Sequence, residues 1–104
     1  MTKELIEITF GNAMAQAREL DSCAESMEQL ANNRLASIQN ELAMTWQGEN
    51  ANHYFVKMER TEDNILKTAE KLRDIAETLR RVARIFRDSE TKALEIATQR
   101  TYEA

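Results

Sequence analysis

Proline is absent from this chain of 104 residues, and glycine occurs only as Gly11 and Gly48. Because tight turns rely heavily on these two residue types, β-sandwiches, β-barrels and other folds with many turns are excluded. Cysteine occurs once, as Cys23, which excludes a scaffold held together by disulfides. The sequence therefore predicts an all-α chain of long helices with few interruptions.

Charge and hydropathy exclude further classes of protein. The formal net charge is −4, which argues against nucleic acid and anionic membranes as partners. No apolar run approaches the roughly 18 residues that a membrane-spanning helix needs. Residues 1–7 carry acids where a Sec signal peptide has a basic and then an apolar stretch. We therefore expect a protein that is made in the cytoplasm, lacks a Sec signal and does not insert into membranes.

The hydrophobic pattern divides the first half of the expected single domain, 1–104, into two segments. Within residues 1–11, Ile6, Ile8 and Phe10 alternate with polar side chains, a period of two that predicts an extended N-terminal arm. A helix that runs on through Gly11 is the alternative. Over residues 12–45 apolar side chains recur at steps of three and four, which predicts a first helix. One extra residue interrupts these steps near Ala31–Leu35.

The second half of the chain contains one central break and a longer helix. Residues 46–48 are expected to form a turn, because Gly48 can adopt the left-handed conformation that ends a helix. Steps of three and four then predict a second helix over 49–100, followed by a tail over 101–104. The two helices are expected to form an antiparallel hairpin, with Trp46 covering apolar area where they diverge.

Unequal helix lengths predict association. Folding the chain about residue 47 places Asn12 near Val82, so the helix beyond about Arg87 has no helical partner in the chain. A two-helix hairpin of this size also leaves most of its apolar seam exposed. We therefore expect two hairpins to form an antiparallel four-helix bundle, as a homodimer or a heterodimer.

A cluster of arginines in the second helix is a candidate docking patch for an acidic partner. The alternative is local pairing with Glu4 and Glu7, which the hairpin places nearby, because charge runs are mostly solvated or locally paired. The patch consists of Arg80, Arg81, Arg84 and Arg87.

The chain offers little for catalysis or for binding a metal or cofactor. A carboxylate-bridged metal site in a helical bundle needs two Glu-x-x-His motifs. The one histidine, His53, has Asn50 three residues before it, and zinc needs about four ligands. His53 is expected on the surface and Cys23 near the seam as a small apolar residue. No Gly-rich phosphate loop is present either, so we expect no enzyme activity, catalytic residue, metal or cofactor.

The central tripeptide Trp46-Gln47-Gly48 is a W-x-G motif between two amphipathic helices, in a proline-free chain of about a hundred residues. In motif, length and composition the chain resembles the WXG family, the small helical ESAT-6-like proteins of type VII (ESX) secretion systems. Family members also carry a Y-x-x-x-D/E export motif late in the second helix. Phe86 and Glu90 stand at the corresponding positions here, with phenylalanine in place of tyrosine.

The resemblance implies a non-enzymatic function in secretion. In the family, the W-x-G of one protomer and the late-helix motif of its partner form a composite export signal, which here corresponds to Trp46, Gly48, Phe86 and Glu90. The resemblance implies a substrate exported without a Sec signal, or an adaptor that pairs with a larger toxin. Its partners would be a second WXG protein, identical or related, and the type VII secretion ATPase. An intracellular coiled-coil adaptor or regulator with no role in secretion is the alternative.

Overall fold

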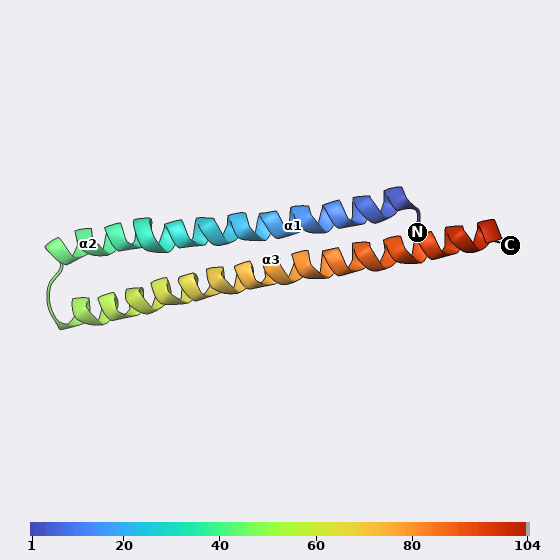
Figure 1. The fold of residues 1–104 in the computed structure, drawn as a ribbon. Helices are drawn as coiled ribbons and strands as arrows, with labels where there is room; N and C mark the ends of the chain where they lie inside the picture. The colour runs from blue at the N-terminus through green and yellow to red at the C-terminus, as the bar shows by residue number, and fades with distance from the viewer. Residues whose placement is uncertain (104) are drawn as a thin grey trace. The chain divides into compact units, whose positions relative to one another are not determined.

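The computed structural model describes residues 1–103 as a succession of helices. Their order is α1 (Lys3–Gln29), the π-helical segment η1 (Leu30–Leu35), α2 (Ala36–Thr45) and α3 (Glu49–Glu103) (Figure 1). No strand occurs among these described residues. The predicted all-α fold class is confirmed.

Contacts divide the described residues into two units. Unit 1 joins residues 1–20 to the residues from Asp74 onward, and unit 2 comprises Asp21–Arg73. In unit 1 the first part of α1 lies beside the last part of α3 (Figure 1). The two segments are antiparallel, because Phe10 contacts Arg87 whereas Ala13 lines a groove with Leu79. In unit 2 the chain reverses between α2 and α3, which is the predicted helical hairpin. The prediction of one domain over 1–104 stays a prediction.

The extended arm predicted for residues 1–11 is wrong. α1 begins at Lys3 and runs through Gly11, as the alternative proposed. The Thr2 hydroxyl caps this helix by accepting a hydrogen bond from the Leu5 N–H at 3.2 Å. Ile6 is only 1% exposed. Burial of this large side chain in a helix outweighs the local preference of an alternating pattern for extended backbone.

The longer α1 changes what α3 can pack against. Lys3 lines a groove together with Leu94 and Thr98 in unit 1. The prediction that the chain beyond about Arg87 lacks a helical partner is therefore wrong as far as Gln99, the last residue that lines this groove. α3 also continues past its expected end at residue 100, so residues 101–103 are helical rather than a tail. The last residue of the predicted tail, 104, lies outside the described residues.

The π-helical segment η1 lies where the extra residue interrupts the hydrophobic steps. A π turn makes i→i+5 hydrogen bonds and so absorbs one additional residue within a continuous helix. Ala31 stays buried in this segment, and Leu35 at its end is half-buried. The insertion is thereby taken up locally.

Alanine makes up most of the core in both units. Ile6 is the one large side chain that is fully buried among the described residues. Methyl groups allow two helices to approach closely, but they bury little apolar area. Larger apolar side chains of the seam, such as Leu72 and Leu79, lie beside the alanines and stay half-buried. The buried alanines recur every seventh residue over most of each helix and are Ala17, Ala24 and Ala31 in the first helical run, and Ala51, Ala69, Ala76 and Ala83 in α3.

Candidate functional site

The W-x-G turn lies in unit 2 between α2 and α3. Trp46 leaves the helical conformation with φ −119° and ψ 114°, while its backbone N–H still donates to the Leu42 carbonyl at 2.7 Å. Gly48 has a φ of 115°, a conformation that L-residues rarely adopt. Its carbonyl accepts a hydrogen bond from the Asn52 N–H at 3.1 Å, which opens α3. The turn thus occupies the residues that the sequence assigned to it.

The Trp46 ring packs on the first turns of α3. Its centroid lies 5.2 Å from that of Tyr54 and 6.2 Å from that of Phe55, in tilted and edge-on arrangements that favour aromatic pairs. The tryptophan nevertheless remains 39% exposed. The expectation that it covers apolar area holds only in part, because much of the indole stays in solvent.

Alanine substitutions of the two glycines are expected to have opposite effects. At Gly11, inside α1, an added Cβ meets nothing within 4 Å, so Gly11→Ala should stabilise the protein by about 0.5–1 kcal/mol. Gly48 also faces open space, but its φ of 115° strains any L side chain, so Gly48→Ala should cost about 1–2 kcal/mol. Urea titration followed by circular dichroism at one protein concentration measures both. A stabilising Gly48→Ala would contradict the strain argument.

Phe86 and Glu90, the candidate export motif, lie one helical turn apart in α3 of unit 1. Both side chains are half-buried. Phe86 lines an apolar groove of about 200 Å³ together with Phe10, Ala13 and Leu79. Glu90 makes no hydrogen bond or ion pair within the described chain, although its seam position would suit an apolar side chain. Packing within the unit explains the phenylalanine but does not explain the carboxylate.

The two halves of the composite signal belong to different units. Trp46 and Gly48 are part of unit 2, and Phe86 and Glu90 are part of unit 1. Neither unit by itself therefore contains the whole signal that the resemblance implies.

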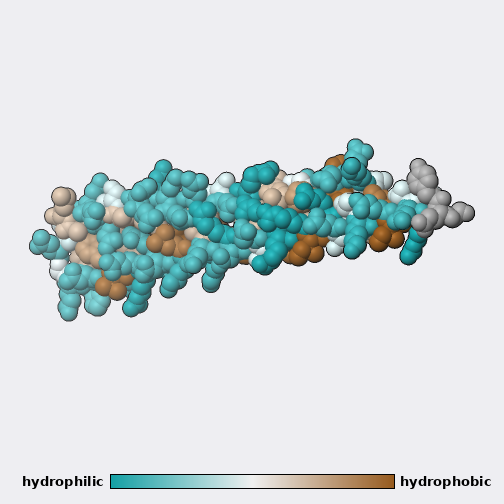
Figure 2. Space-filling view, in the orientation of Figure 1, coloured by the Kyte–Doolittle hydropathy of each residue, from teal (hydrophilic) through white to brown (hydrophobic). Residues whose placement is uncertain are grey.

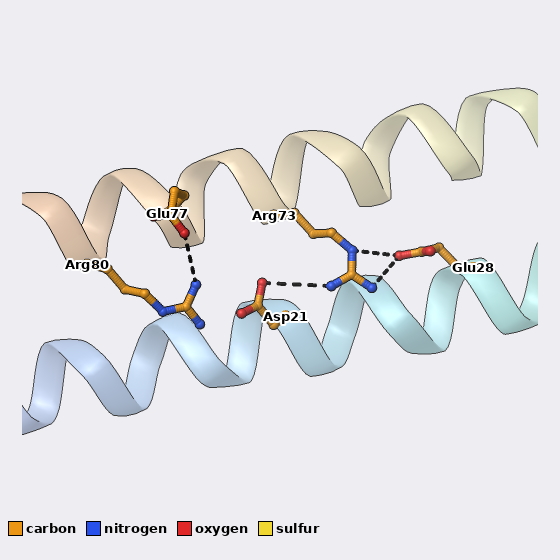
Figure 3. A network of polar contacts seen from close by, with 5 residues as sticks. All are labelled: Asp21, Glu28, Arg73, Glu77 and Arg80. Carbon is orange, nitrogen blue, oxygen red and sulfur yellow. Dashed lines mark hydrogen bonds and ion pairs between the residues drawn. The ribbon is translucent and has the colours of Figure 1, made fainter.

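Two of the four clustered arginines are engaged within unit 1. Arg80 is half-buried and approaches the Glu77 carboxylate, with Nη1 3.6 Å from Oε2 (Figure 3). The Arg87 guanidinium carbon lies 4.0 Å from the centroid of the Phe10 ring, within the range of a cation–π interaction. These two side chains contact Glu77 and Phe10 of the same unit, so they are poorly placed to bind a separate partner.

The other two clustered arginines remain exposed. Arg81 donates to the Thr78 hydroxyl at 3.5 Å, and Arg84 makes no ion pair within the described residues. Glu4 and Glu7 pair with none of the four arginines in this part of the chain. The described residues thus show no pairing of the four arginines with these two acids, and docking of an acidic partner on the patch stays a prediction.

Arg73 is an interaction partner that the sequence analysis missed. In unit 2 its Nε donates to Glu28 Oε1 at 2.8 Å, and its Nη1 lies 4.0 Å from Asp21 Oδ1 (Figure 3). All three side chains are about a third to a half exposed, so the cluster contributes at most about 1 kcal/mol. Spacing could have revealed it, because Arg73, Arg80 and Arg87 recur every seventh residue. These three residues are called the arginine row below.

Cys23 and His53 show no arrangement for chemistry. Cys23 is exposed, contrary to its expected place near the seam, and His53 is exposed near the start of α3. Within residues 1–103, no group of three or more His, Cys, Asp or Glu side chains could hold a metal ion. No helix in the described part of the chain is long and apolar enough to cross a membrane.

Residues 5–91 match the model of the WXG100 family, described as proteins of 100 residues with WXG. The matched range contains the W-x-G turn as well as Phe86 and Glu90. No curated protein and no solved structure matches the chain.

Proposed function

Since this chain belongs to the WXG100 family, the ESAT-6-like family of type VII secretion substrates, we propose that it is exported by a type VII system or escorts a larger toxin through one. Members of this family are small helical proteins, not enzymes, and they typically form dimers with partners in type VII secretion. The W-x-G turn carries the proposal, because Gly48 adopts a positive φ and Trp46 is left partly in solvent.

The proposed export signal combines two protomers. Trp46 and Gly48 of one protomer and Phe86 and Glu90 of its partner form the recognition surface. Support comes from the Glu90 carboxylate, which is half-buried and has no partner in the described chain. Because Phe86 lacks a hydroxyl, recognition depends on the aromatic ring and the carboxylate one turn away. Arg81 and Arg84 are the docking patch for an acidic partner, for which we propose the secretion ATPase.

Export is expected to depend on the secretion ATPase and on Glu90. The chain should accumulate in the medium of a strain with an active type VII system and stay in the cells when the ATPase is inactivated. Glu90→Gln keeps the size of the side chain and removes its charge, so it should reduce export to background while helicity is retained. Immunoblots of medium and cells measure both effects.

Glu95→Gln is the matched control, because Glu95 is an exposed glutamate one turn further along α3. This variant should be exported like the natural protein. If the chain never leaves cells that have an active type VII system, the export proposal is wrong and the intracellular adaptor is favoured.

A further inference from the structure

Basic side chains line one side of α3 in unit 2. Steps of three, seven and four residues separate them, which places them on the same side of a helix with 3.6 residues per turn. They span about 21 Å along the helix axis, and Asn64 stands between the two pairs. We call this set the basic stripe. It consists of Lys57, Arg60, Lys67 and Lys71, which all belong to unit 2.

The basic stripe has no anionic partner within the described residues. All four side chains are exposed, and none of them makes an ion pair in this part of the chain. Arg73 of the arginine row differs, because its guanidinium is already paired with Glu28 and Asp21. Figure 2 shows hydrophilic side chains over much of the visible surface of unit 2. The charges of the stripe are therefore available to another molecule.

The basic stripe lies on the side of α3 that faces away from the seam. Ala69 is fully buried at the seam of unit 2. Lys67 and Lys71 stand two residues before and two residues after it, which turns each of them about 160° away around the helix axis. A molecule that packs against the seam side leaves these lysines in solvent. The stripe can therefore make a contact of its own, separate from any association through apolar side chains.

An acidic row borders one side of the basic stripe. Asp63 follows Arg60 by three residues and so lies about 60° to one side of it. Glu70 takes the same place relative to Lys67, and both acids are exposed. The other side of the stripe carries no charge over residues 57–71. A positive stripe thus runs beside a negative row, Asp63 and Glu70, on the outer surface of α3.

This arrangement favours a narrow anionic partner. An anionic membrane or a nucleic-acid duplex presents a broad surface of negative charge, which would meet the acidic row together with the stripe and be repelled by it. A helix is only about 10–12 Å wide and can follow the stripe alone. We propose that the basic stripe binds a helix of another protein that carries glutamate or aspartate at the same steps of three, seven and four residues.

The stripe adds charge complementarity to a contact and is weak by itself. An exposed ion pair changes a binding constant by up to about five-fold. Complementary charges act mainly by speeding association, and salt screens them. The stripe should therefore accelerate the capture of its partner helix, most strongly at low ionic strength. This inference goes beyond the proposed function and does not depend on export.

A designed helical peptide with glutamates at steps of three, seven and four residues tests the stripe. The control peptide has the same composition, with its glutamates distributed around the helix. Each peptide is titrated into the isotope-labelled full chain and followed by nuclear magnetic resonance. The first peptide should shift the amide signals of residues 57–71 and bind about five-fold or more tightly than the control peptide. High salt should remove the difference.

Charge reversal identifies the residues that bind the peptide. The double variant Lys67→Glu and Lys71→Glu should weaken binding of the acidic peptide about ten-fold or more. The matched control is Lys3→Glu and Lys92→Glu, which changes the net charge equally at exposed lysines outside the stripe and should bind almost like the natural chain. A peptide with lysine in place of glutamate should bind the reversed stripe. Circular dichroism checks that both variants stay helical.

Three results would overturn the proposal. The first is equal affinity of the natural chain for the two peptides, a comparison that needs no variant to fold. The second is an equal loss of binding in the stripe variant and its matched control. The third is tighter binding to phosphatidylglycerol vesicles or to duplex DNA than to the acidic peptide, because the partner would then be a broad anionic surface. None of these measurements involves export, so the proposed function is tested separately.

Discussion

Ala69→Leu is expected to lower the free energy of unfolding by about 1–3 kcal/mol, the usual cost of overpacking a closely packed core. Ala69 is fully buried in unit 2 and belongs to the line of alanines that recurs every seventh residue. A leucine there adds three carbon atoms where α3 accommodates only a methyl group. Its side chain must either leave its preferred rotamer or push the neighbouring helix away. Urea titration at fixed protein concentration measures the loss.

The matched control for this substitution is Ala43→Leu. Ala43 is exposed in α2, so the same added atoms should change stability by no more than about 0.5 kcal/mol. If Ala69→Leu were as neutral as the control, the close approach of the helices inferred from the alanine core would be wrong.

Trp46→Ala is expected to cost about 1–2 kcal/mol, less than the loss for a fully buried tryptophan. The ring contacts Tyr54 and Phe55, and such aromatic pairs contribute about 0.5–1.5 kcal/mol beyond the area they bury. Its 39% exposure lowers the contribution from burial. Thermal unfolding followed by circular dichroism is the measurement, with both proteins at the same concentration so that any association affects them equally.

Trp46→Phe separates packing from recognition. A phenyl ring retains the contacts with Tyr54 and Phe55, so this variant should recover most of the stability that Trp46→Ala loses. An unchanged melting temperature in Trp46→Ala would show that these ring contacts contribute nothing. If Trp46→Phe is stable but no longer exported, the indole itself takes part in recognition.

Much of the fold follows from local chemistry and was predictable. The absence of proline and the position of Gly48 locate the long helices and the reversal between α2 and α3, because few residues can end a helix. The extra residue in the hydrophobic steps marks the place of η1. The first turns of α1 were not predictable in this way. Alternation favours extended backbone locally, but the burial of Ile6 in unit 1 depends on residues far away in the sequence.

The candidate site was predictable where it depends on rare residues. Trp46 and Gly48 are found because the chain has one tryptophan and two glycines. The roles of the four clustered arginines were not predicted, because residues that are close in sequence can lie on different sides of a helix. Arg80 is engaged within unit 1, whereas its neighbour Arg81 is exposed on another side. The steps of three and four also do not distinguish the apolar positions that are buried, which carry alanine, from those that are half-buried, which carry leucine.

The alanine core also determines how stability varies with temperature. The heat capacity change on unfolding grows with the apolar area that becomes exposed, and it is about 1.2–1.5 kcal/mol/K for an ordinary domain of a hundred residues. With mostly methyl groups in its core, one copy of this chain should lie below that range and have a shallow stability curve. Such a chain remains helical over a broad temperature range without becoming very stable. A partner that covered the isoleucine and valine side chains exposed in one copy would steepen the curve.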